Sequence, residues 1–391
     1  MPLRFLTAGE SHGPALTAIV EGLPAGVAVT KAAIDRELKR RMGGHGRGGR
    51  MKIEADEAEI LSGIRFGRTL GSPVALLIRN RDFANWTDVM SPHGARPEGD
   101  AARPVTRPRP GHADLAGAQK YETHDARDVL ERASARETAA RTAAGALAKA
   151  FLSELGVVVT SRTIAVGGVV AGDGEGDDVD ALLALPDDAP MRSPVAATVQ
   201  AMIAAVDEAR ARADSVGGTF EVIARGLPVG VGSHVHWDRR LDARLGGALL
   251  SIQAVKAASI GDGLDVASGG GREAHDVIAY DPKARRFTRS TNRAGGIEGG
   301  MTNGEIVRLR GYLKPLATLE KALPSVDLVT KSSFAADVER TDTVPIVAAG
   351  VVGEAMVALV LADAILEKFG GDTVGATRAS LDGYLERLRV F

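Results

Sequence analysis

The stretch Ala18-Ile-Val-Glu-Gly-Leu-Pro-Ala-Gly-Val27 occurs a second time, in altered form, as Val222-Ile-Ala-Arg-Gly-Leu-Pro-Val-Gly-Val231. In both copies an apolar, strand-like run ends at Gly-Leu-Pro, and a helical stretch that contains arginine follows. Two related halves of a duplicated protein carry the same elements in the same order, so this echo predicts two strand–turn–helix units that share one core. A chance similarity is the alternative, because ten residues are few.

Capping signals place two helices in the first part of the chain. Thr30 is a typical N-cap for a helix over residues 31–41, and the pair Gly43-Gly44 ends it. Ser134-Ala-Arg-Glu137 fits a capping box, which predicts a helix over residues 134–156. Between them, residues 79–109 are polar and rich in proline, and a loop of that length is usually functional or disordered.

The most apolar window of the chain covers residues 348–366. It has the length of a membrane span, but Glu354 and Asp363 interrupt it, and each carboxylate would be costly inside a bilayer. This pattern favours a buried core helix. The first nine residues show no basic region followed by a long apolar stretch, so we expect no signal peptide, no membrane contact and a cytoplasmic location.

Composition excludes several classes of protein. The 391 residues are 45% hydrophobic and 25% charged, which is ordinary for a globular chain and excludes a disordered or collagen-like one. The 48 Lys and Arg nearly balance the 50 Asp and Glu, so binding to nucleic acid through a bulk positive charge is not expected. The absence of cysteine excludes disulfides, thiolate catalysis and Cys-ligated zinc.

Three common motifs have weak support from their surroundings. Gly9-Glu-Ser-His-Gly13 matches the G-x-S-x-G turn of serine hydrolases, but only one short strand precedes Ser11 and no clear helix follows. Residues 44–49 match G-x-G-x-x-G, but they follow a helix and not a strand, which excludes a Rossmann site. His234 and His236 lack recognisable metal-ligand partners, so no metal is expected.

The remaining signal is a scatter of arginine and histidine in loops rich in glycine and proline. An exposed basic surface is the plain interpretation of any single arginine, but the set as a whole favours a site for a small, multiply charged anion. Histidines in such a site are suited to donate protons near neutral pH. An RNA-binding surface would need interleaved aromatic residues, and the whole chain has only 2 Trp, 4 Tyr and 9 Phe. The set comprises His12, Arg41, His45, Arg47, Arg50, Arg107, Arg109, His112, Arg132, Ser134, Arg136, Arg340 and Asp342.

In these same segments the sequence resembles the chorismate synthase family. The matching blocks follow the family's order along nearly the whole chain, and nine blocks in register make an accident implausible. They are Gly9-Glu-Ser-His-Gly13, Gly46-Arg-Gly-Gly-Arg50, Arg107-Pro-Arg-Pro-Gly-His-Ala-Asp114, Arg132-Ala-Ser-Ala-Arg-Glu-Thr-Ala-Ala-Arg141, Gln253-Ala-Val-Lys256, Ile260-Gly-Asp-Gly263, Asn292-Arg-Ala-Gly-Gly-Ile-Glu-Gly-Gly300, Lys314-Pro315 and Arg340-Thr-Asp342.

The resemblance implies a fold and an activity. The fold is an α/β (α+β) protein, a β-α-β sandwich with internal pseudo-twofold duplication. Residues 1–391 then form one domain with two related halves, roughly 1–210 and 211–391. The activity is a 1,4-anti elimination that converts 5-enolpyruvylshikimate 3-phosphate to chorismate and phosphate and requires reduced FMN. The family is usually homotetrameric, and NADPH or an external flavin reductase would act only to reduce the flavin.

The resemblance also assigns roles to residues. His12 would protonate the departing phosphate, His112 would manage the proton on the reduced flavin, and Asp342 would help to take up the ring hydrogen. Arg41, Arg47, Arg109, Arg136 and Arg340 would lie around the substrate, although Arg41 and Arg47 are alternatively contacts to a nicotinamide dinucleotide phosphate. FMN would contact Arg132, Ala133, Ser134, Gln253, Ala254, Gly299, Lys314, Pro315, Leu316, Ala317, Thr318 and Arg340.

Two positions depart from the family pattern. The family commonly has a polar residue and a serine after Lys-Pro, whereas this chain has Leu316 and Ala317, so we expect only backbone contacts to the flavin there. Where the family often has Arg-Ser-Asp or Arg-His-Asp, this chain has Thr341, which leaves the flanking Arg340 and Asp342 in place.

Overall fold

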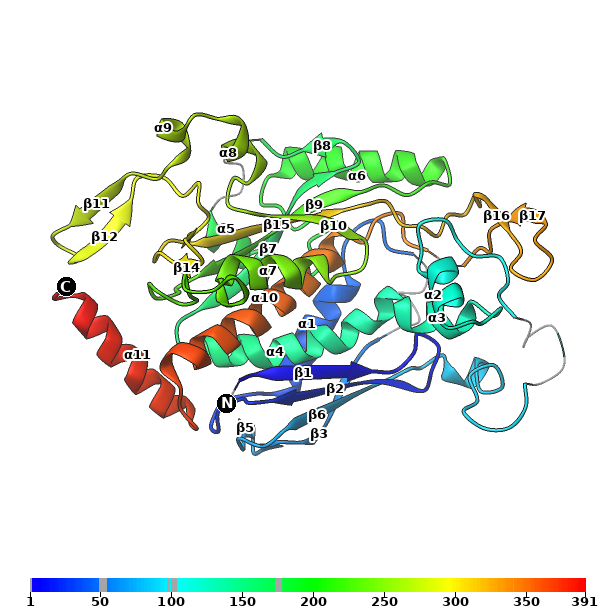
Figure 1. The fold of residues 1–391 in the computed structure, drawn as a ribbon, viewed down its shortest axis with the longest axis horizontal. Coiled ribbons are helices and arrows are strands. Elements are labelled where there is room, and N and C mark those ends of the chain that lie inside the picture. The colour runs from blue at the N-terminus through cyan, green and yellow to red at the C-terminus, as the bar shows by residue number, and fades with distance from the viewer. Residues whose placement is uncertain (1, 49–54, 97–98, 100–103, 173–177, 340) are drawn as a thin grey trace.

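The computed structural model describes residues 2–48, 55–96, 99, 104–172, 178–339 and 341–391 (Figure 1). Within these ranges one series of elements occurs twice. The first series is β1 (Arg4–Ala8), β2 (Ala15–Glu21), α1 (Lys31–Met42), β3 (Ala58–Ser62), β4 (Ile64–Arg65), β5 (Arg68–Thr69), β6 (Val74–Arg79) and α4 (Thr138–Glu154). The second series is β7 (Val158–Val166), β9 (Gly218–Arg225), α7 (Leu241–Leu250), β10 (Val255–Ile260), β13 (Ile297–Glu298), β14 (Met301–Thr302), β15 (Val307–Leu313) and α10 (Ile346–Phe369).

The strand order of the two main sheets repeats as well. The first sheet has the antiparallel order β1-β2-β6-β3, and the second has the equivalent order β7-β9-β15-β10, with the short β8 (Val169–Val170) added beside β7. Helix α4 packs on β2 and β6, α10 packs on β7 and β9, and the two helices pack on each other, so the helices lie between the sheets (Figure 1). The expected β-α-β sandwich with pseudo-twofold duplication is therefore confirmed.

The turn that follows β2 and β9 explains why the Gly-Leu-Pro sequence is repeated. Gly22 and Gly226 both have φ +92, in the left-handed region that favours glycine. In the first copy the Thr69 hydroxyl donates to the proline carbonyl of the turn at 2.6 Å, and in the second Thr302 makes the same bond at 2.6 Å. The echo in the sequence is therefore a repeated structural unit and not a coincidence.

The repeated series does not divide at residue 210, where the sequence suggested it. The second series begins at β7, so β8, α5 (Val179–Leu183) and α6 (Ala196–Ala211) form an insertion between β7 and β9. The echo marks only the second strand of each series, and it therefore misses the strand that precedes it. The main core contains residues of both series, which supports our proposal that residues 1–391 form one domain.

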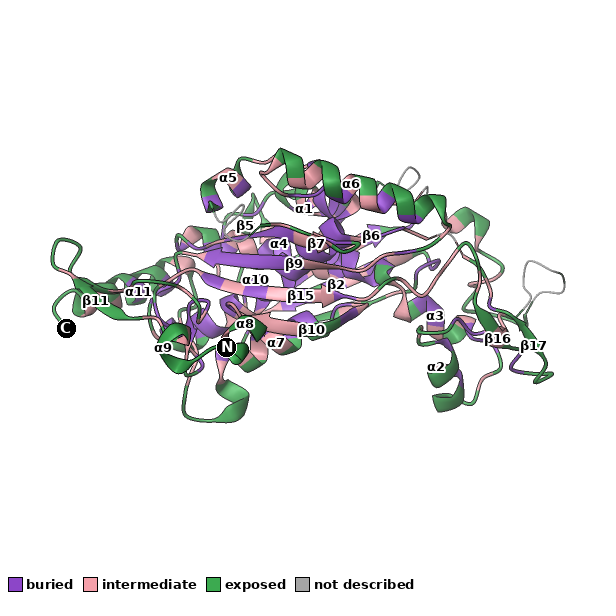
Figure 2. Ribbon diagram, turned by 90° about the horizontal axis from the view of Figure 1, so that it is seen from above, coloured by how far each residue is buried: buried purple, intermediate pink, exposed green. Residues whose placement is uncertain are grey.

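The remaining elements are additions to the duplicated core. Several of these additional elements lie on the surface: α2, α11 and the β11–β12 hairpin are largely exposed to solvent (Figure 2). In chain order, the additional elements are η2 (Phe83–Asn85), α2 (Asp114–Lys120), α3 (Arg127–Ala133), η4 (Ala135–Glu137), η5 (Trp237–Arg239), α8 (Leu264–Ser268), α9 (Gly271–Ala274), β11 (Ile278–Asp281), β12 (Arg286–Arg289), β16 (Pro324–Val326), β17 (Ser333–Ala335) and α11 (Val374–Leu388).

The two capping predictions had different outcomes. The Thr30 side chain accepts from the backbone N–H of Ala33, which confirms it as the N-cap of α1. The helix expected from Ser134 begins instead at Thr138, because Ser134 caps the short 3₁₀ turn η4 by accepting from a backbone N–H at 3.3 Å. The Glu137 side chain bonds Arg141 at 2.9 Å, so it does not complete the expected capping box.

Helix α10 has the length and apolarity of a membrane span, but 89% of its most apolar window is buried inside the fold. Glu354 lies in the middle of this helix and is 0% exposed. Its carboxylate accepts two hydrogen bonds of 2.8 Å from Arg40 on α1, one of 2.7 Å from Lys149 on α4 and one of 2.7 Å from Ser161 on β7. Burial alone would raise the pKa of Glu354, but Lys149 and Arg40 hold it well below its ordinary value.

Replacing Glu354 should therefore destabilise the protein strongly. We expect Glu354→Gln to lower the free energy of unfolding by about 3–5 kcal/mol, because it removes the fully buried carboxylate and leaves Arg40 and Lys149 to share Glu37 alone. The depressed pKa means that the wild-type contribution is complete above the ordinary value of 4.5 and is lost as the pH falls below it. Urea unfolding at neutral and acidic pH measures both effects.

Glu367→Gln on the same helix is the matched control. Glu367 pairs with Arg239 and Arg244 near the surface, where its side chain is 46% exposed, and its loss should cost less than about 1 kcal/mol. Equal costs for the two variants would show that the buried network does not hold the helices together.

Candidate active site

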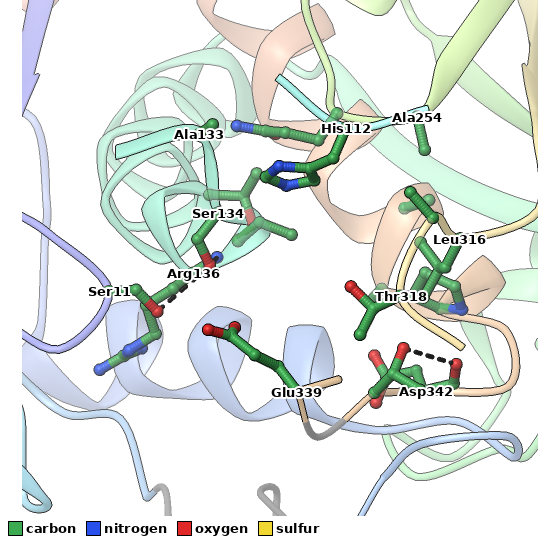
Figure 3. Close-up of a pocket in the computed structure, with 18 of the residues that line it drawn as sticks. Ser11, His112, Ala133, Ser134, Arg136, Ala254, Leu316, Thr318, Glu339 and Asp342 are labelled. Atoms are coloured by element: carbon green, nitrogen blue, oxygen red, sulfur yellow. Dashed lines mark hydrogen bonds between the residues drawn. The ribbon is translucent and has the colours of Figure 1, made fainter. Parts of the chain in front are cut away.

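One cavity of about 390 Å³ lies where the two series meet. Its lining includes the N-terminal turns that begin α4 and α10, represented by Arg136, Thr138 and Ala348. Helix N-termini carry partial positive charge and unpaired N–H groups, which favours anions at this end of both core helices. Figure 3 shows Ser134 and Ser11 on one wall, with Thr318 and Asp342 across the cavity.

Most of the predicted site residues line this cavity. They come from the β1–β2 loop, the loop after α1, the segments around α2 to α4, the loop before β10, the segment after β15 and the segment before α10. The predicted residues among the lining are His12, Arg41, Arg47, Arg109, His112, Ala133, Ser134, Arg136, Gln253, Ala254, Lys314, Leu316, Ala317, Thr318 and Asp342.

Five of the predicted residues that the structure describes do not border the cavity: His45, Arg107, Arg132, Gly299 and Pro315. Gly299 lies in the exposed turn between β13 and β14, and Pro315 lies within the lining segment without itself bordering the cavity. The Arg132 side chain turns back to the end of β1, where it donates to the Thr7 carbonyl at 2.9 Å. Arg50 and Arg340 lie outside the described residues.

His12 is held in place by a glutamate that sequence reasoning missed. The ring Nδ1 lies 2.9 and 3.0 Å from the two carboxylate oxygens of Glu131, and the His12 backbone N–H donates to the same carboxylate at 2.8 Å. Burial alone would raise the pKa of Glu131, but the hydrogen bonds from His12 outweigh it and lower the pKa below its ordinary value. His12 therefore lines the cavity while its Nδ1 atom is already bonded to Glu131.

His112 makes a similar pair with Asp114. Its Nδ1 forms a short hydrogen bond with Asp114, which also accepts from Arg109 Nε at 2.8 Å. The ring nitrogen Nδ1 cannot both accept a hydrogen bond from Arg109 and donate one to a carboxylate. Because the guanidinium of Arg109 already donates to Asp114, we assign the proton to Nδ1, which then donates to Asp114 as well. Burial would raise the pKa of Asp114, but His112 and Arg109 hold it well below its ordinary value.

A buried carboxylate joins two further arginines. Asp56 accepts from Arg136 Nη1 at 2.6 Å and lies 3.6 Å from Arg41 Nη1. Arg41 also donates to the Thr138 hydroxyl and to the Ala135 carbonyl, both at 2.9 Å. All three charged side chains are almost fully buried, so the positions of the two guanidinium groups are fixed by the fold.

Asp342 lies on the opposite wall and binds the loop that follows α1. It pairs with Arg47 at 3.0 Å and accepts from the backbone N–H of Gly48 at 2.6 Å. A Cβ on Gly48 would lie 2.4 Å from the Thr341 carbonyl, so this close contact requires glycine. The glycine-rich loop therefore allows the segment before α10 to approach Arg47.

A further wall carries features that suit a bound cofactor. The Gln253 Oε1 atom is buried and has no hydrogen-bond partner among the described residues. The next residue, Ala254, has φ +66, which is strained for a residue with a side chain and is typical of functional sites. Lys314 donates to the Gly111 carbonyl at 3.0 Å, and burial lowers its pKa below the ordinary value.

The charges of the lining favour a small anion with several negative groups. The lining has five cationic side chains and two carboxylates. This excess of positive charge favours binding of an anion. In the part of the chain that the structure describes, no group of three or more His, Asp or Glu side chains is arranged to hold a metal ion. The charged lining residues are Arg41, Arg47, Arg109, Arg136, Lys314, Glu339 and Asp342.

The positive cavity predicts stabilisation by a polyanion. Inorganic pyrophosphate at about 100 times its dissociation constant should stabilise the folded state by about 2.7 kcal/mol, because it binds only that state. We expect Arg47→Gln to need at least a tenfold higher pyrophosphate concentration for the same stabilisation. Thermal melting at constant ionic strength measures this, with Arg212→Gln at the exposed C-cap of α6 as the control. An equal response of both variants would contradict an anion site in this cavity.

Comparison with known proteins gives one consistent result. A family model described as chorismate synthase matches residues 3–366. The chorismate synthase of Solibacter usitatus (strain Ellin6076) is 54% identical over 387 residues, which cover 99% of each chain. That of Geobacter sulfurreducens (strain ATCC 51573 / DSM 12127 / PCA) is 53% identical over 395 residues, which cover 100% of each chain.

A solved structure agrees with the sequence matches. A crystal structure of chorismate synthase superposes with a TM-score of 0.79 at 38% identity and covers 100% of this chain and 99% of the other. Matches of this identity over the full length, together with the family model, leave one assignment. The chain belongs to the chorismate synthase family.

Proposed function

We propose that the cavity is the active site in which this chain, a lyase of the chorismate synthase family, removes phosphate from 5-enolpyruvylshikimate 3-phosphate. This 1,4-anti elimination yields chorismate, an intermediate in the biosynthesis of aromatic amino acids. The observation that carries the proposal is the excess of fixed cationic groups in the lining. The substrate has two carboxylates and a phosphate, which is the charge pattern that such a lining favours.

Arg41, Arg47, Arg109 and Arg136 are the proposed ligands of the substrate. Asp56 and Asp114 hold three of these guanidinium groups from behind, so little side-chain entropy is lost when an anion binds. A nicotinamide dinucleotide phosphate at Arg41 and Arg47 is the alternative, and NADPH would then serve only to reduce the flavin.

Reduced FMN is the proposed cofactor, and when bound it supplies the electron density that lets the allylic phosphate leave without net redox change. The buried, unsatisfied Gln253 Oε1 supports a ligand with a ring N–H at this wall, and the strained Ala254 supports a functional role for the same turn. Ala133, Ser134 and the segment 314–318 would complete this side, with Leu316 and Ala317 contributing backbone groups. Arg132 and Arg340 are further proposed ligands of FMN. We do not include Gly299 in the site that one chain forms.

The chain's own residues would handle the protons. His12 is the proposed acid for the phosphate oxygen, since its Nδ1 is committed to Glu131 and its other nitrogen is left for a ligand. His112, oriented by Asp114, is the proposed proton carrier on the cofactor side. Asp342 is the proposed carboxylate that assists removal of the ring hydrogen.

The serine hydrolase alternative has no support. Ser134 Oγ donates to Ser11 Oγ at 3.2 Å, and the nearby His12 ring bonds Glu131. The family assignment is to a lyase.

A homotetramer in the cytoplasm is our proposal for the assembled enzyme. The β11–β12 hairpin exposes Ile278, Tyr280 and Phe287, each more than half exposed, and such side chains suit a contact between copies. Size-exclusion chromatography with light scattering measures the number of chains.

The proposed reaction predicts phosphate release from 5-enolpyruvylshikimate 3-phosphate under anaerobic conditions only when chemically reduced FMN is present. Chorismate should form in equal amount, which its ultraviolet absorbance measures. Oxidised FMN and the omission of flavin are the controls. Release that is equally fast without flavin, or release without chorismate, would contradict the proposal.

Asp342→Asn separates a chemical from a structural role. The amide can still accept from Gly48 N–H, but it is a poor base, so we expect turnover to fall at least about 10²-fold while the fold is kept. Substituting deuterium for the abstracted ring hydrogen should then slow the reaction more than in the wild type. Wild-type turnover with an unchanged isotope effect would leave Asp342 only the role of holding the loop after α1.

A further inference from the structure

The environment of His12 fixes the imidazole on two sides. Its Nδ1 edge faces the Glu131 carboxylate at 2.9 and 3.0 Å, and its face stacks on Trp86 with 3.8 Å between ring centroids. The Trp86 indole N–H donates to Asp82 at 3.0 Å, and the Arg127 guanidinium lies 5.4 Å from the indole ring. The ring is therefore clamped, although it forms part of the cavity wall.

Glu131 is itself held rigidly. It is 3% exposed, Arg127 donates to one of its oxygens at 3.0 Å, and its backbone carbonyl accepts from the Ser11 N–H at 3.0 Å. Together with the bond from the His12 backbone, these contacts join α3 to the β1–β2 loop at both the main chain and the side chain. The His12 ring cannot rotate away without breaking this unit.

We infer that Glu131 is a positioning residue for His12: it accepts the Nδ1 proton and presents the other ring nitrogen, Nε2, to the substrate's phosphate. This rests on the proposed function, in which His12 is the acid. Trp86 restricts the ring to one plane, so the carboxylate sets its direction within that plane.

A double-mutant cycle tests whether Glu131 acts through His12. We expect Glu131→Gln to reduce kcat about 10- to 100-fold with less than about a threefold change in KM, within the range that a positioned acid contributes. Glu131→Asp, which keeps the carboxylate, should recover part of this loss. In a His12→Ala background Glu131→Gln should have no further effect, because the group on which it acts is already gone.

The control for the loss of a buried carboxylate is Glu221→Gln. Glu221 is 0% exposed and pairs with Arg162, Arg308 and Arg310 on the outer face of the second sheet, away from the cavity lining. This variant should lose stability but keep the wild-type kcat. If it loses kcat as strongly as Glu131→Gln does, the effect is a general one of stability and the inference is overturned.

Tryptophan fluorescence reports the position of the ring without any turnover. The chain has 2 Trp, and Trp237 is 73% exposed outside the cavity, so Trp237→Phe leaves Trp86 as the single emitter. The stacked imidazole should quench Trp86, and His12→Ala should therefore raise the emission. Glu131→Gln should raise it part of the way, because the amide keeps only one of the two oxygens that face Nδ1 and so holds the ring less firmly.

The outcomes separate the inference from the proposed function. Wild-type kcat and unchanged Trp86 emission in Glu131→Gln would overturn the positioning role while leaving the elimination reaction intact. If Glu131→Gln reduces kcat as much in the His12→Ala background as in the wild type, Glu131 does not act through His12. That result also overturns the inference. A wild-type protein that releases no phosphate would contradict the proposed function, and the fluorescence would still decide whether Glu131 holds the ring.

Discussion

The buried carboxylate of Glu354 is the constraint on which the architecture depends. A charge without exposure to solvent must be satisfied in all directions, and here the partners come from α1, α4 and β7, which belong to both repeated series. Gly145 permits the close contact of α4 and α10, since a Cβ there would lie 2.3 Å from Ala355. The network and the small residues thus fix the two core helices side by side.

The position of the site follows from that arrangement. Because α4 and α10 are equivalent elements of a duplicated fold and pack together, their N-terminal turns meet at one end of the sandwich (Figure 1). The cavity lies there and takes its lining from both series. Neither series alone would form it, which is a physical reason for the two halves to remain in one chain.

The same principle of buried carboxylates recurs around the cavity. Asp56, Asp114 and Glu131 each bond a cationic or histidine side chain that lines the cavity and so fix its position. Groups fixed before the substrate arrives need no reorganisation during the reaction, and such preorganised electrostatics is generally the largest contribution to enzyme catalysis. Glycines at the close contacts, such as Gly48, allow the loops to approach without strain.

The sequence predicted the parts of this structure that local chemistry decides. The Gly-Leu-Pro echo gave the duplication, because the left-handed glycine is a local requirement, and Thr30 gave the start of α1. Residues whose role is created by distant contacts were missed: Asp56 lies far along the chain from Arg136, and Glu131 far from His12. Asp114 was within reach of sequence reasoning, since it follows Arg109 and His112 in one short motif.

Hydrogen exchange of the backbone, measured anaerobically with and without reduced FMN and 5-enolpyruvylshikimate 3-phosphate, tests most directly whether both ligands occupy this one cavity. We predict that the ligands protect residues 11–13, 133–136, 253–254 and 314–318, which line or border the cavity. We predict that they add no protection in the β11–β12 hairpin. Protection by the two ligands in separate places, or only outside the lining segments, would contradict a single site at the junction of the two series.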